Sequence, residues 1–87
     1  MTPEPEGGKQ TVRVKAIGYL AVHLPDGGPV DLSVPVGGSP TAGEVMRLVG
    51  IPEDEVFLVI VNGRRVRREH RLVPGDEVVF VPPVAGG

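Results

Sequence analysis

The residues of this chain best suited to carry chemistry are its last six, Pro82-Pro83-Val84-Ala85-Gly86-Gly87. The two prolines restrict the backbone and predict a stiff base, while Gly86 and Gly87 have no side chains and fit a narrow channel. We expect residues 82–87 to form an extended, flexible tail, and we interpret the terminal carboxylate of Gly87 as the reactive group. Six extended residues reach roughly 20 Å, which is enough to enter a buried site of a partner.

Other kinds of reactive site lack the residues that they need. The chain has no cysteine, which excludes disulfides, thiolate metal ligands and thiol nucleophiles together. His23 and His70 accompany no Ser or Cys motif, so no catalytic dyad is expected, and residues 53–55 lack the alternating ligands of a calcium loop. The glycine pairs form neither GxGxxG nor a Walker motif. The sequence therefore predicts no cofactor and no metal bound by this chain alone.

One further surface is suggested by charge. Five arginines lie close together in the sequence, namely Arg64, Arg65, Arg67, Arg68 and Arg71. They could dock an acidic partner surface, they could contact RNA, or they could be the solvated charges of an edge strand. No aromatic residues interleave with them for base stacking, and the net charge of −2 gives no general attraction to nucleic acid. We therefore expect no nucleic acid partner.

Length and composition predict one small domain. A chain of 87 residues is long enough for a single core. Residues 1–10 are rich in Pro, Glu and Gly without apolar periodicity, and they predict a disordered N-terminal tail. The domain itself is then expected over residues 11–81. No apolar run approaches the roughly 20 residues of a membrane span and no secretory signal pattern is present, so we expect a cytoplasmic protein without a membrane partner.

Five segments are predicted to be strands because their apolar residues alternate or run continuously between turn signals. They are residues 11–16, 30–34, 57–61, 64–68 and 77–81. The first two should pair as a hairpin. Asn62-Gly63 is a strong hairpin signal between the third and the fourth, because both residues suit positive φ angles.

A single short helix of about nine residues is predicted between the second and third strands. Thr41 and Glu44 have the spacing of a capping box, and Gly50 stands where a left-handed C-terminal cap is wanted. The expected apolar stripe that docks on the sheet consists of Val45, Leu48 and Val49.

One helix covers only one face of such a sheet, yet residues 57–61 and 78–81 are apolar on both faces. The second face is therefore either open, which would make it a candidate docking surface, or covered by residues 19–24 and the loops. The sequence leaves both interpretations open. Phe57 and Phe80 are both expected in the core.

The order of elements and the last strand resemble a known family. Gly75-Asp76-Glu77-Val78, an apolar strand and the tail Pro-Pro-Val-Ala-Gly-Gly are similar to the C-terminus of the MoaD/ThiS sulfur carriers. The resemblance covers about residues 11–87. It implies an α+β fold of the ubiquitin-like β-grasp type, with the order β-β-α-β-β-β and a mixed sheet with one short helix packed on one face.

The resemblance also implies a function. A ubiquitin-activating-type enzyme, similar to MoeB or ThiF, would use ATP to adenylate the Gly87 carboxylate, and sulfur delivery would give a thiocarboxylate. The chain would be a cosubstrate rather than an enzyme, and the acceptor would be a large synthase subunit similar to MoaE. Gly87 and Gly86 would be the reactive end, and the residues expected to contact partners are Phe80, Val81, Pro82, Pro83, Val84, Ala85, Arg64 and Arg65.

Molybdopterin biosynthesis is the pathway that this kind of tail favours. Val81 stands where the molybdopterin subunits often have an aromatic residue, so other acceptors stay open. They are thiazole formation in thiamine synthesis and tRNA thiolation. A ubiquitin-like protein modifier or a plain interaction module is the alternative from another class. The terminal glycine pair could also be a chance occurrence in a chain with thirteen glycines.

Overall fold

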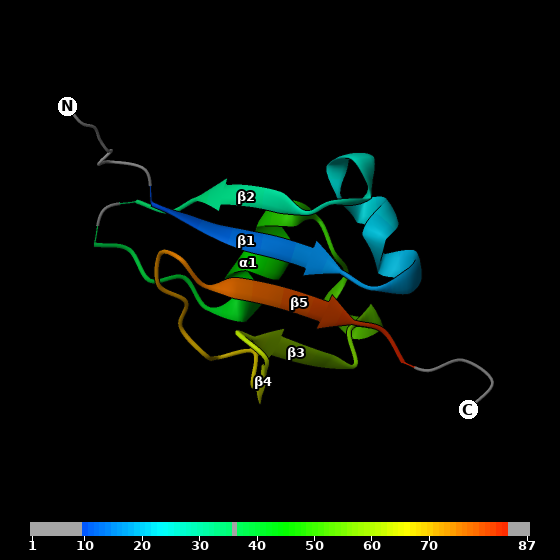
Figure 1. Ribbon diagram of the computed structural model, residues 1–87. Coiled ribbons are helices and arrows are strands. Elements are labelled where there is room, and N and C mark those ends of the chain that lie inside the picture. The colour runs from blue at the N-terminus through cyan, green and yellow to red at the C-terminus, as the bar shows by residue number, and fades with distance from the viewer. Residues whose placement is uncertain (1–9, 36, 84–87) are drawn as a thin grey trace.

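The computed structural model describes residues 10–35 and 37–83 of the chain. They form one five-stranded sheet with the order β2-β1-β5-β3-β4, shown in Figure 1. The strands are β1 (Thr11–Ala16), β2 (Val30–Ser33), β3 (Leu58–Val61), β4 (Arg64–Val66) and β5 (Glu77–Val81). The helix α1 (Ala42–Val49) is joined by three 3₁₀ helices, η1 (Gly18–His23), η2 (Pro25–Gly27) and η3 (Glu53–Glu55).

The sheet is mixed because β5 lies between β1 and β3. β1 pairs antiparallel with β2 and parallel with β5, while β3 pairs antiparallel with both β5 and β4. The predicted order β-β-α-β-β-β and the first hairpin are confirmed. Of the N-terminal tail predicted over residues 1–10, only Gln10 lies in the described part, and its carbonyl accepts a hydrogen bond from the Val34 amide at 2.7 Å.

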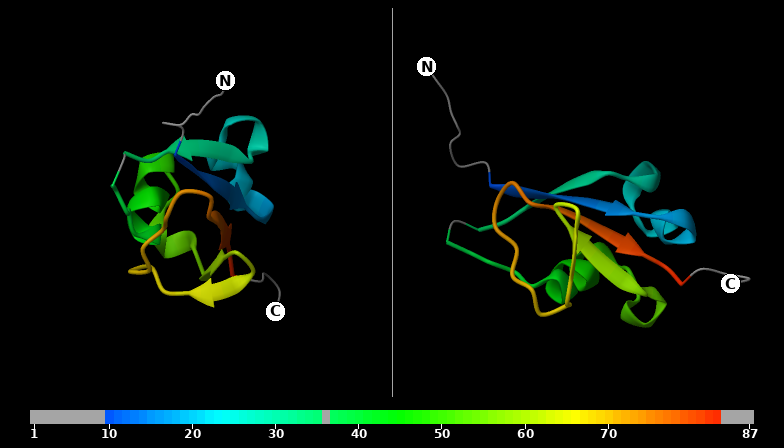
Figure 2. Two further views of the ribbon diagram at one scale, coloured as in Figure 1. Left: turned by 60° about the vertical axis from the view of Figure 1, so that its left-hand side comes forward. Right: turned by 60° about the horizontal axis from the view of Figure 1, so that its bottom comes forward.

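The core lies between the sheet and α1, which covers one face of the sheet in Figure 2. Alternate residues of the strands face it, so β1 contributes Val12 and Val14 and β5 contributes Val78 and Phe80. Burial of these side chains drives folding, because each removes apolar surface from water. The other fully buried or nearly buried residues are Leu20, Leu24, Val34, Ala42, Val45, Met46, Ile51, Val56, Val59, Val61 and Leu72.

The ends of α1 are as predicted. The Thr41 hydroxyl accepts a hydrogen bond from the Glu44 amide at 3.1 Å, and the Glu44 carboxylate accepts one from the Thr41 amide at 2.8 Å. Together they satisfy two amides that have no partner within the helix. Gly50 ends the helix with φ 85°, a conformation that L side chains rarely adopt.

The predicted apolar stripe of α1 is partly wrong. Val45 is buried and Val49 packs against the core, but Leu48 is 68% exposed. The buried face instead runs through Ala42, Val45, Met46 and Val49. Their spacing of three, four and seven residues from Ala42 follows one side of a helix. Leu48, like Arg47 before it, lies outside this buried side.

The 3₁₀ helix η1 closes one end of the core. Its Leu20 is fully buried and Leu24, just after it, is nearly so, while Val22 points to solvent. His23 lies near η3, where its Nε2 is 3.7 Å from a carboxylate oxygen of Glu55. Residues 19–24 therefore cover the end of the core and leave the second face of the sheet uncovered.

The second hairpin forms with the predicted turn. Asn62 and Gly63 have φ angles of 52° and 83°, which is the combination that a two-residue hairpin turn requires. β4 is shorter than predicted, because it ends at Val66 instead of continuing to residue 68. It forms one edge of the sheet, with arginine side chains that discourage pairing with another strand.

Candidate functional site

The base of the predicted tail is held in the middle of the sheet. The Phe80 carbonyl accepts a hydrogen bond from the Ile17 amide at 3.0 Å, and the Val81 carbonyl accepts one from the Phe57 amide at 2.7 Å. Strand β5 is thus bonded to a neighbour on each side up to the point where the tail begins. Figure 1 shows β5 leaving the sheet beside the C-terminal end of β1.

Pro82 and Pro83 differ in their surroundings. Pro82 is buried, and Pro83, the last described residue, is exposed. Gly18, at the start of η1, has a φ of 60°, and a Cβ placed on it would lie 3.6 Å from the Pro82 ring. The buried Pro82 ring is therefore a neighbour of Gly18, just after the end of β1.

The start of β5 is fixed by side chains that the sequence did not reveal. The Asn62 amide group donates to the Asp76 carboxylate at 2.8 Å, and its oxygen accepts a hydrogen bond from the Glu77 amide at 2.9 Å. The second Asp76 oxygen accepts one from the Val73 amide at 2.9 Å. Asn62 was predicted only as a turn residue, and contacts between segments so far apart leave no local signal.

Four of the predicted site residues, Val84, Ala85, Gly86 and Gly87, lie outside the described residues. Their roles stay predictions. The structure places the residues that precede them, and it separates those whose side chains face solvent from those that support the fold.

The predicted partner contact of the Phe80 side chain is wrong. Phe80 is completely buried, because its register opposite Ala16 and Val59 turns it toward the core. The prediction that Phe80 lies in the core is confirmed. Val81 lies one residue further along the strand and is only partly buried, on the face opposite the helix.

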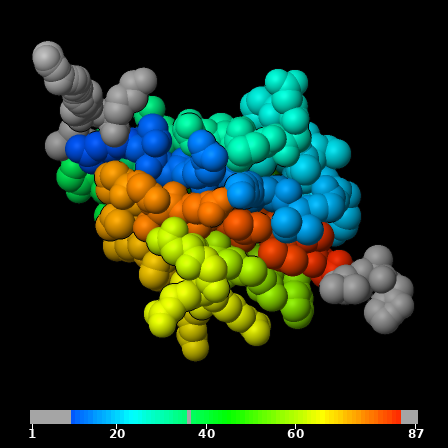
Figure 3. Space-filling view, in the orientation of Figure 1, coloured from blue at the N-terminus to red at the C-terminus, as the bar shows by residue number. Residues whose placement is uncertain are grey.

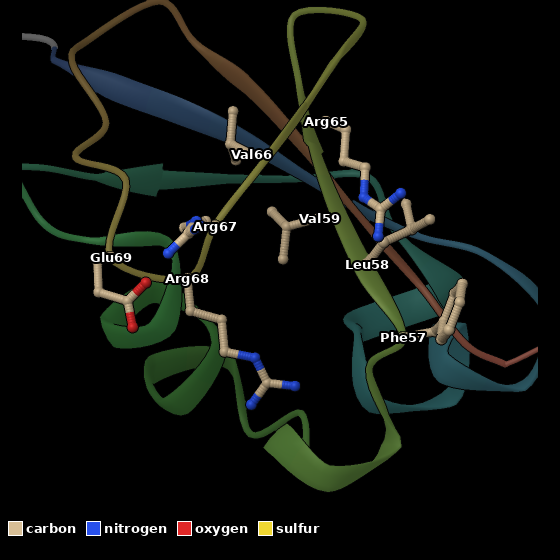
Figure 4. Close-up of a pocket in the computed structure, with 8 residues that line it drawn as sticks. All are labelled: Phe57, Leu58, Val59, Arg65, Val66, Arg67, Arg68 and Glu69. Atoms are coloured by element: carbon tan, nitrogen blue, oxygen red, sulfur yellow. The ribbon is translucent and has the colours of Figure 1, made fainter.

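The expectation that Phe57 lies in the core is wrong, since it is 60% exposed. Phe57 donates its amide hydrogen to Val81, and Leu58 is also the register partner of Val81. Two residues opposite one is the arrangement of a β-bulge, which interrupts the alternation of faces. Figure 4 shows Phe57 and Leu58 on the same side of β3, away from Val59.

The face of the sheet opposite α1 is open, as Figure 3 shows over β1, β5 and β4. Among the described residues, no helix covers it. Its apolar side chains are half-buried or exposed and lie beside the base of the tail. We call them the open-face patch, which consists of Phe57, Leu58, Ile60, Val79 and Val81. Of the two interpretations that the sequence left open, the structure thus supports the open face.

Two ion pairs lie on the same face, toward β2. Lys15 pairs with Glu77, and Arg13 pairs with Asp31 at 3.3 Å. All four side chains are well exposed, so each pair contributes little to stability. Their main consequence is that the charges at this end of the open face are already neutralised.

The five arginines of the predicted basic patch do not act as one group. Arg68 donates hydrogen bonds to the carbonyls of Glu53 and Val56 at 2.9 and 3.0 Å, and Arg71 donates one to the carbonyl of Ser39 at 2.8 Å. These two arginines support loops. Within the part of the chain that the structure describes, the side chains of Arg64, Arg65 and Arg67 make no hydrogen bond or ion pair.

Register separates Arg64 from Arg65. Arg64 is opposite Val61, whose side chain is buried, whereas Arg65 is opposite Ile60 of the open-face patch. Side chains of paired residues lie on the same face of a sheet. Arg65 therefore belongs to the open face and Arg64 to the face that carries the helix, although both were predicted to contact partners.

Residues 10–35 and 37–83 contain no group of three or more His, Asp or Glu side chains placed to hold a metal ion. None of their helices combines the length and the apolar character that crossing a membrane would require.

A family model described as the ThiS family matches residues 27–87. Among curated proteins, the molybdopterin synthase sulfur carrier subunit of Escherichia coli (strain K12) is 51% identical over 35 residues. These residues are 40% of this chain and 43% of that protein. The chain thus spans less than half the length of the curated relative that it matches.

Solved structures share the whole fold. The crystal structure of SAMP1 from Haloferax volcanii is 26% identical with a TM-score of 0.66, over 88% of this chain and 99% of that chain. The solution structure of Urm1 from Trypanosoma brucei is 20% identical with a TM-score of 0.64, over 90% of this chain and 96% of that chain. The predicted ubiquitin-like β-grasp fold is confirmed by this likeness and by the observed sheet order.

Proposed function

Because the family model matches most of its length, this chain belongs to the ThiS family, and we propose that it is a sulfur carrier. The match also confirms the resemblance to the MoaD/ThiS carriers that the last strand and tail indicated. The observation that carries the proposal is that the matched region runs to Gly87 and so includes the whole tail. The backbone hydrogen bonds of Phe80 and Val81 and the burial of Pro82 support it, because a carrier needs a fixed base for its tail.

The proposed chemistry takes place on the terminal carboxylate of Gly87, inside partner enzymes. A carboxylate oxygen attacks the α-phosphate of ATP, the bond to pyrophosphate breaks, and an acyl-adenylate forms. A hydrosulfide ion then attacks the carbonyl carbon, the bond from that carbon to the AMP oxygen breaks, and AMP and a proton leave, which gives the thiocarboxylate. ATP is a substrate of the activating enzyme, and we assign no cofactor to the carrier itself.

Gly86 and Gly87 suit this task because two residues without side chains can pass a narrow entrance. Glycine also loses more conformational entropy than other residues when a partner orders it. Contacts elsewhere on the carrier must offset that loss, and the open-face patch beside Pro82 is the described surface that can provide them.

We infer that the acceptor of the sulfur is the large subunit of a molybdopterin synthase. The identity to the Escherichia coli carrier subunit supports this pathway over the thiazole and tRNA pathways. Conjugation to lysines of other proteins is the second candidate function, and it would leave an isopeptide-linked adduct instead of a thiocarboxylate. The cytoplasmic location stays a prediction from the sequence.

The proposal is tested by mass spectrometry of the intact protein purified from its own organism. We expect a form that is heavier by the difference between one sulfur and one oxygen atom, located on the C-terminal peptide. Isopeptide adducts without such a form would support the protein modifier instead.

Deletion of Gly87 gives the first prediction. It should abolish thiocarboxylate formation with the activating enzyme and ATP. The terminal carboxylate is then carried by Gly86 and ends one residue short of the reactive position in the partner's site. The matched control is deletion of Thr2, which also shortens the chain by one residue and should retain full activity. Sulfur transfer by the Gly87 deletion variant would overturn the proposal.

A further inference from the structure

A recess lies at the edge of the sheet, between the β3–β4 hairpin and the segment that leads from β4 to β5. It has a volume of about 600 Å³, and both segments contribute to its lining. Cationic and apolar side chains occur together in it. The lining residues on which the following argument depends are Arg64, Val66, His70, Arg71, Val73 and Asp76.

Register places the hairpin wall of this recess on the helix side of the sheet. Arg64 is opposite Val61 and Val66 is opposite Val59, and both Val61 and Val59 are buried in the core. Side chains of paired residues lie on the same face, so this wall is separate from the open-face patch. The recess also lies beside Asp76, just before β5 begins, whereas the tail follows the other end of that strand.

The second wall, formed by residues 70–73, is held in place by the start of α1. The His70 carbonyl accepts a hydrogen bond from the Ala42 amide at 2.9 Å, and the Leu72 amide donates one to the Pro40 carbonyl at 2.7 Å. Ligand sites are usually formed before the ligand binds, because a wall that is already ordered costs less entropy on binding.

The recess has an excess of positive charge. Within residues 10–35 and 37–83, the Arg64 side chain makes no hydrogen bond or ion pair. Arg71 bonds the Ser39 carbonyl, which is uncharged, so its positive charge is not neutralised. Asp76 is the one carboxylate among the described lining residues, and both of its oxygens already accept hydrogen bonds from amide groups.

We propose that this recess binds a small phosphate ester, with its phosphoryl group between Arg64 and Arg71 and its organic part against Val66 and Val73. A carboxylate has two oxygens, and a single guanidinium group bonds both of them. A phosphoryl group has three acceptor oxygens, so it can bond two arginines at once. His70 adds a ring nitrogen that can donate a further hydrogen bond.

A small molecule fits the recess better than RNA does. RNA binding draws on many phosphate contacts, and the net charge of the chain is −2. Arg68, which would extend the positive surface, is bonded to the carbonyls of Glu53 and Val56 instead. The volume of about 600 Å³ lies within the range of roughly 300–1,000 Å³ that is usual for small-molecule sites.

The test is a titration of the full chain followed through its backbone amides by NMR, at constant ionic strength in chloride. Three probes are compared. Phenyl phosphate has both a phosphoryl group and an apolar ring, inorganic phosphate lacks the ring, and benzoate has a carboxylate in place of the phosphoryl group.

The variants are Arg64→Gln and Arg71→Gln, and the matched control is Arg67→Gln. The control removes the same charge from an exposed arginine that does not line the recess. Thermal unfolding establishes that each variant is folded. Arg64→Gln remains informative even if Arg71→Gln is unstable, because the Arg64 side chain bonds no other group in the described residues.

We expect phenyl phosphate to shift the amides of residues 61–66 and 70–76. Inorganic phosphate should bind at the same residues about fivefold more weakly, because it has no ring for Val66 and Val73 to cover. Benzoate should bind about tenfold more weakly than phenyl phosphate. Arg64→Gln and Arg71→Gln should each weaken phenyl phosphate binding about tenfold, since each loses a charge-assisted hydrogen bond. Arg67→Gln should weaken it by less than about twofold.

Several results would overturn the proposal. Absence of shifts at the recess would show that no site exists, and equal weakening in Arg64→Gln and Arg67→Gln would show a general effect of charge. Benzoate that binds as tightly as phenyl phosphate would assign the recess to carboxylates. Tighter binding of a short oligouridylate at the same residues would assign it to nucleic acid. The measurement does not involve the tail, so its outcome is independent of the proposed sulfur-carrier function.

Discussion

Phe57 and Phe80 show that the pairing of strands decides whether an apolar residue is buried or exposed. Both lie in apolar runs, and both were expected in the core. Phe80 is buried opposite Val59, while a bulge opposite Val81 turns Phe57 to the open face. Hydrophobic character is equal at the two positions, so only the pairing of strands distinguishes a core residue from a docking residue.

Substitution of each phenylalanine by alanine tests this distinction. Phe80→Ala should lower the free energy of unfolding by about 3–5 kcal/mol, because it leaves a cavity in the core. Phe57→Ala should lower it by less than about 0.5 kcal/mol, as a surface change does. Urea unfolding at one pH and temperature measures both values. Comparable losses would show that Phe57 is packed in solution.

At the scale of elements, local patterns predicted local structure well. The capping box of α1, the Gly50 cap and the Asn62-Gly63 turn each depend on a few neighbouring residues, and each is confirmed. The buried face of α1 was partly missed, since Leu48 and Met46 are both apolar and only docking on the sheet selects Met46.

The capping box offers a prediction for the helix as a unit. Thr41→Ala should cost about 1 kcal/mol of stability, because the Glu44 amide loses its acceptor at the start of a helix of eight residues. The matched control is Thr41→Ser, which keeps the hydroxyl group and should retain most of the stability. Thermal or urea unfolding of both variants measures the difference. A loss as large in Thr41→Ser would mean that the Thr41 methyl group, and not the cap, matters.

At the scale of the whole molecule, the sequence predicted the fold but not the surface around the end of β5, and the reactive tail stays a prediction. Composition and the last strand were enough to predict a reactive end at Gly87, because those features are contiguous in the chain. The separation of Arg64 from Arg65 and the support of the Glu53–Val56 turn by Arg68 depend on segments that meet only after folding. No periodicity records such contacts, so the docking face had to come from the structure.

The central place of β5 has a consequence for the carrier that can be measured. Proteins open locally at their edges at a lower cost than they unfold globally. β5 is bonded to both β1 and β3, whereas β4 pairs with β3 alone and forms an edge. We therefore expect the β5 amides to exchange their hydrogens only through global unfolding, with the full denaturant dependence of that reaction.

The β4 amides are the internal comparison, because they should exchange faster and with little dependence on denaturant. Native-state hydrogen exchange followed by NMR at several urea concentrations measures both strands in one sample. Exchange of the β5 amides as fast as that of the β4 amides would contradict the prediction. The proposed insertion of the tail into partner sites requires a base that stays in place. Attachment to a strand that opens only when the whole domain unfolds keeps the base of the tail fixed relative to the open face.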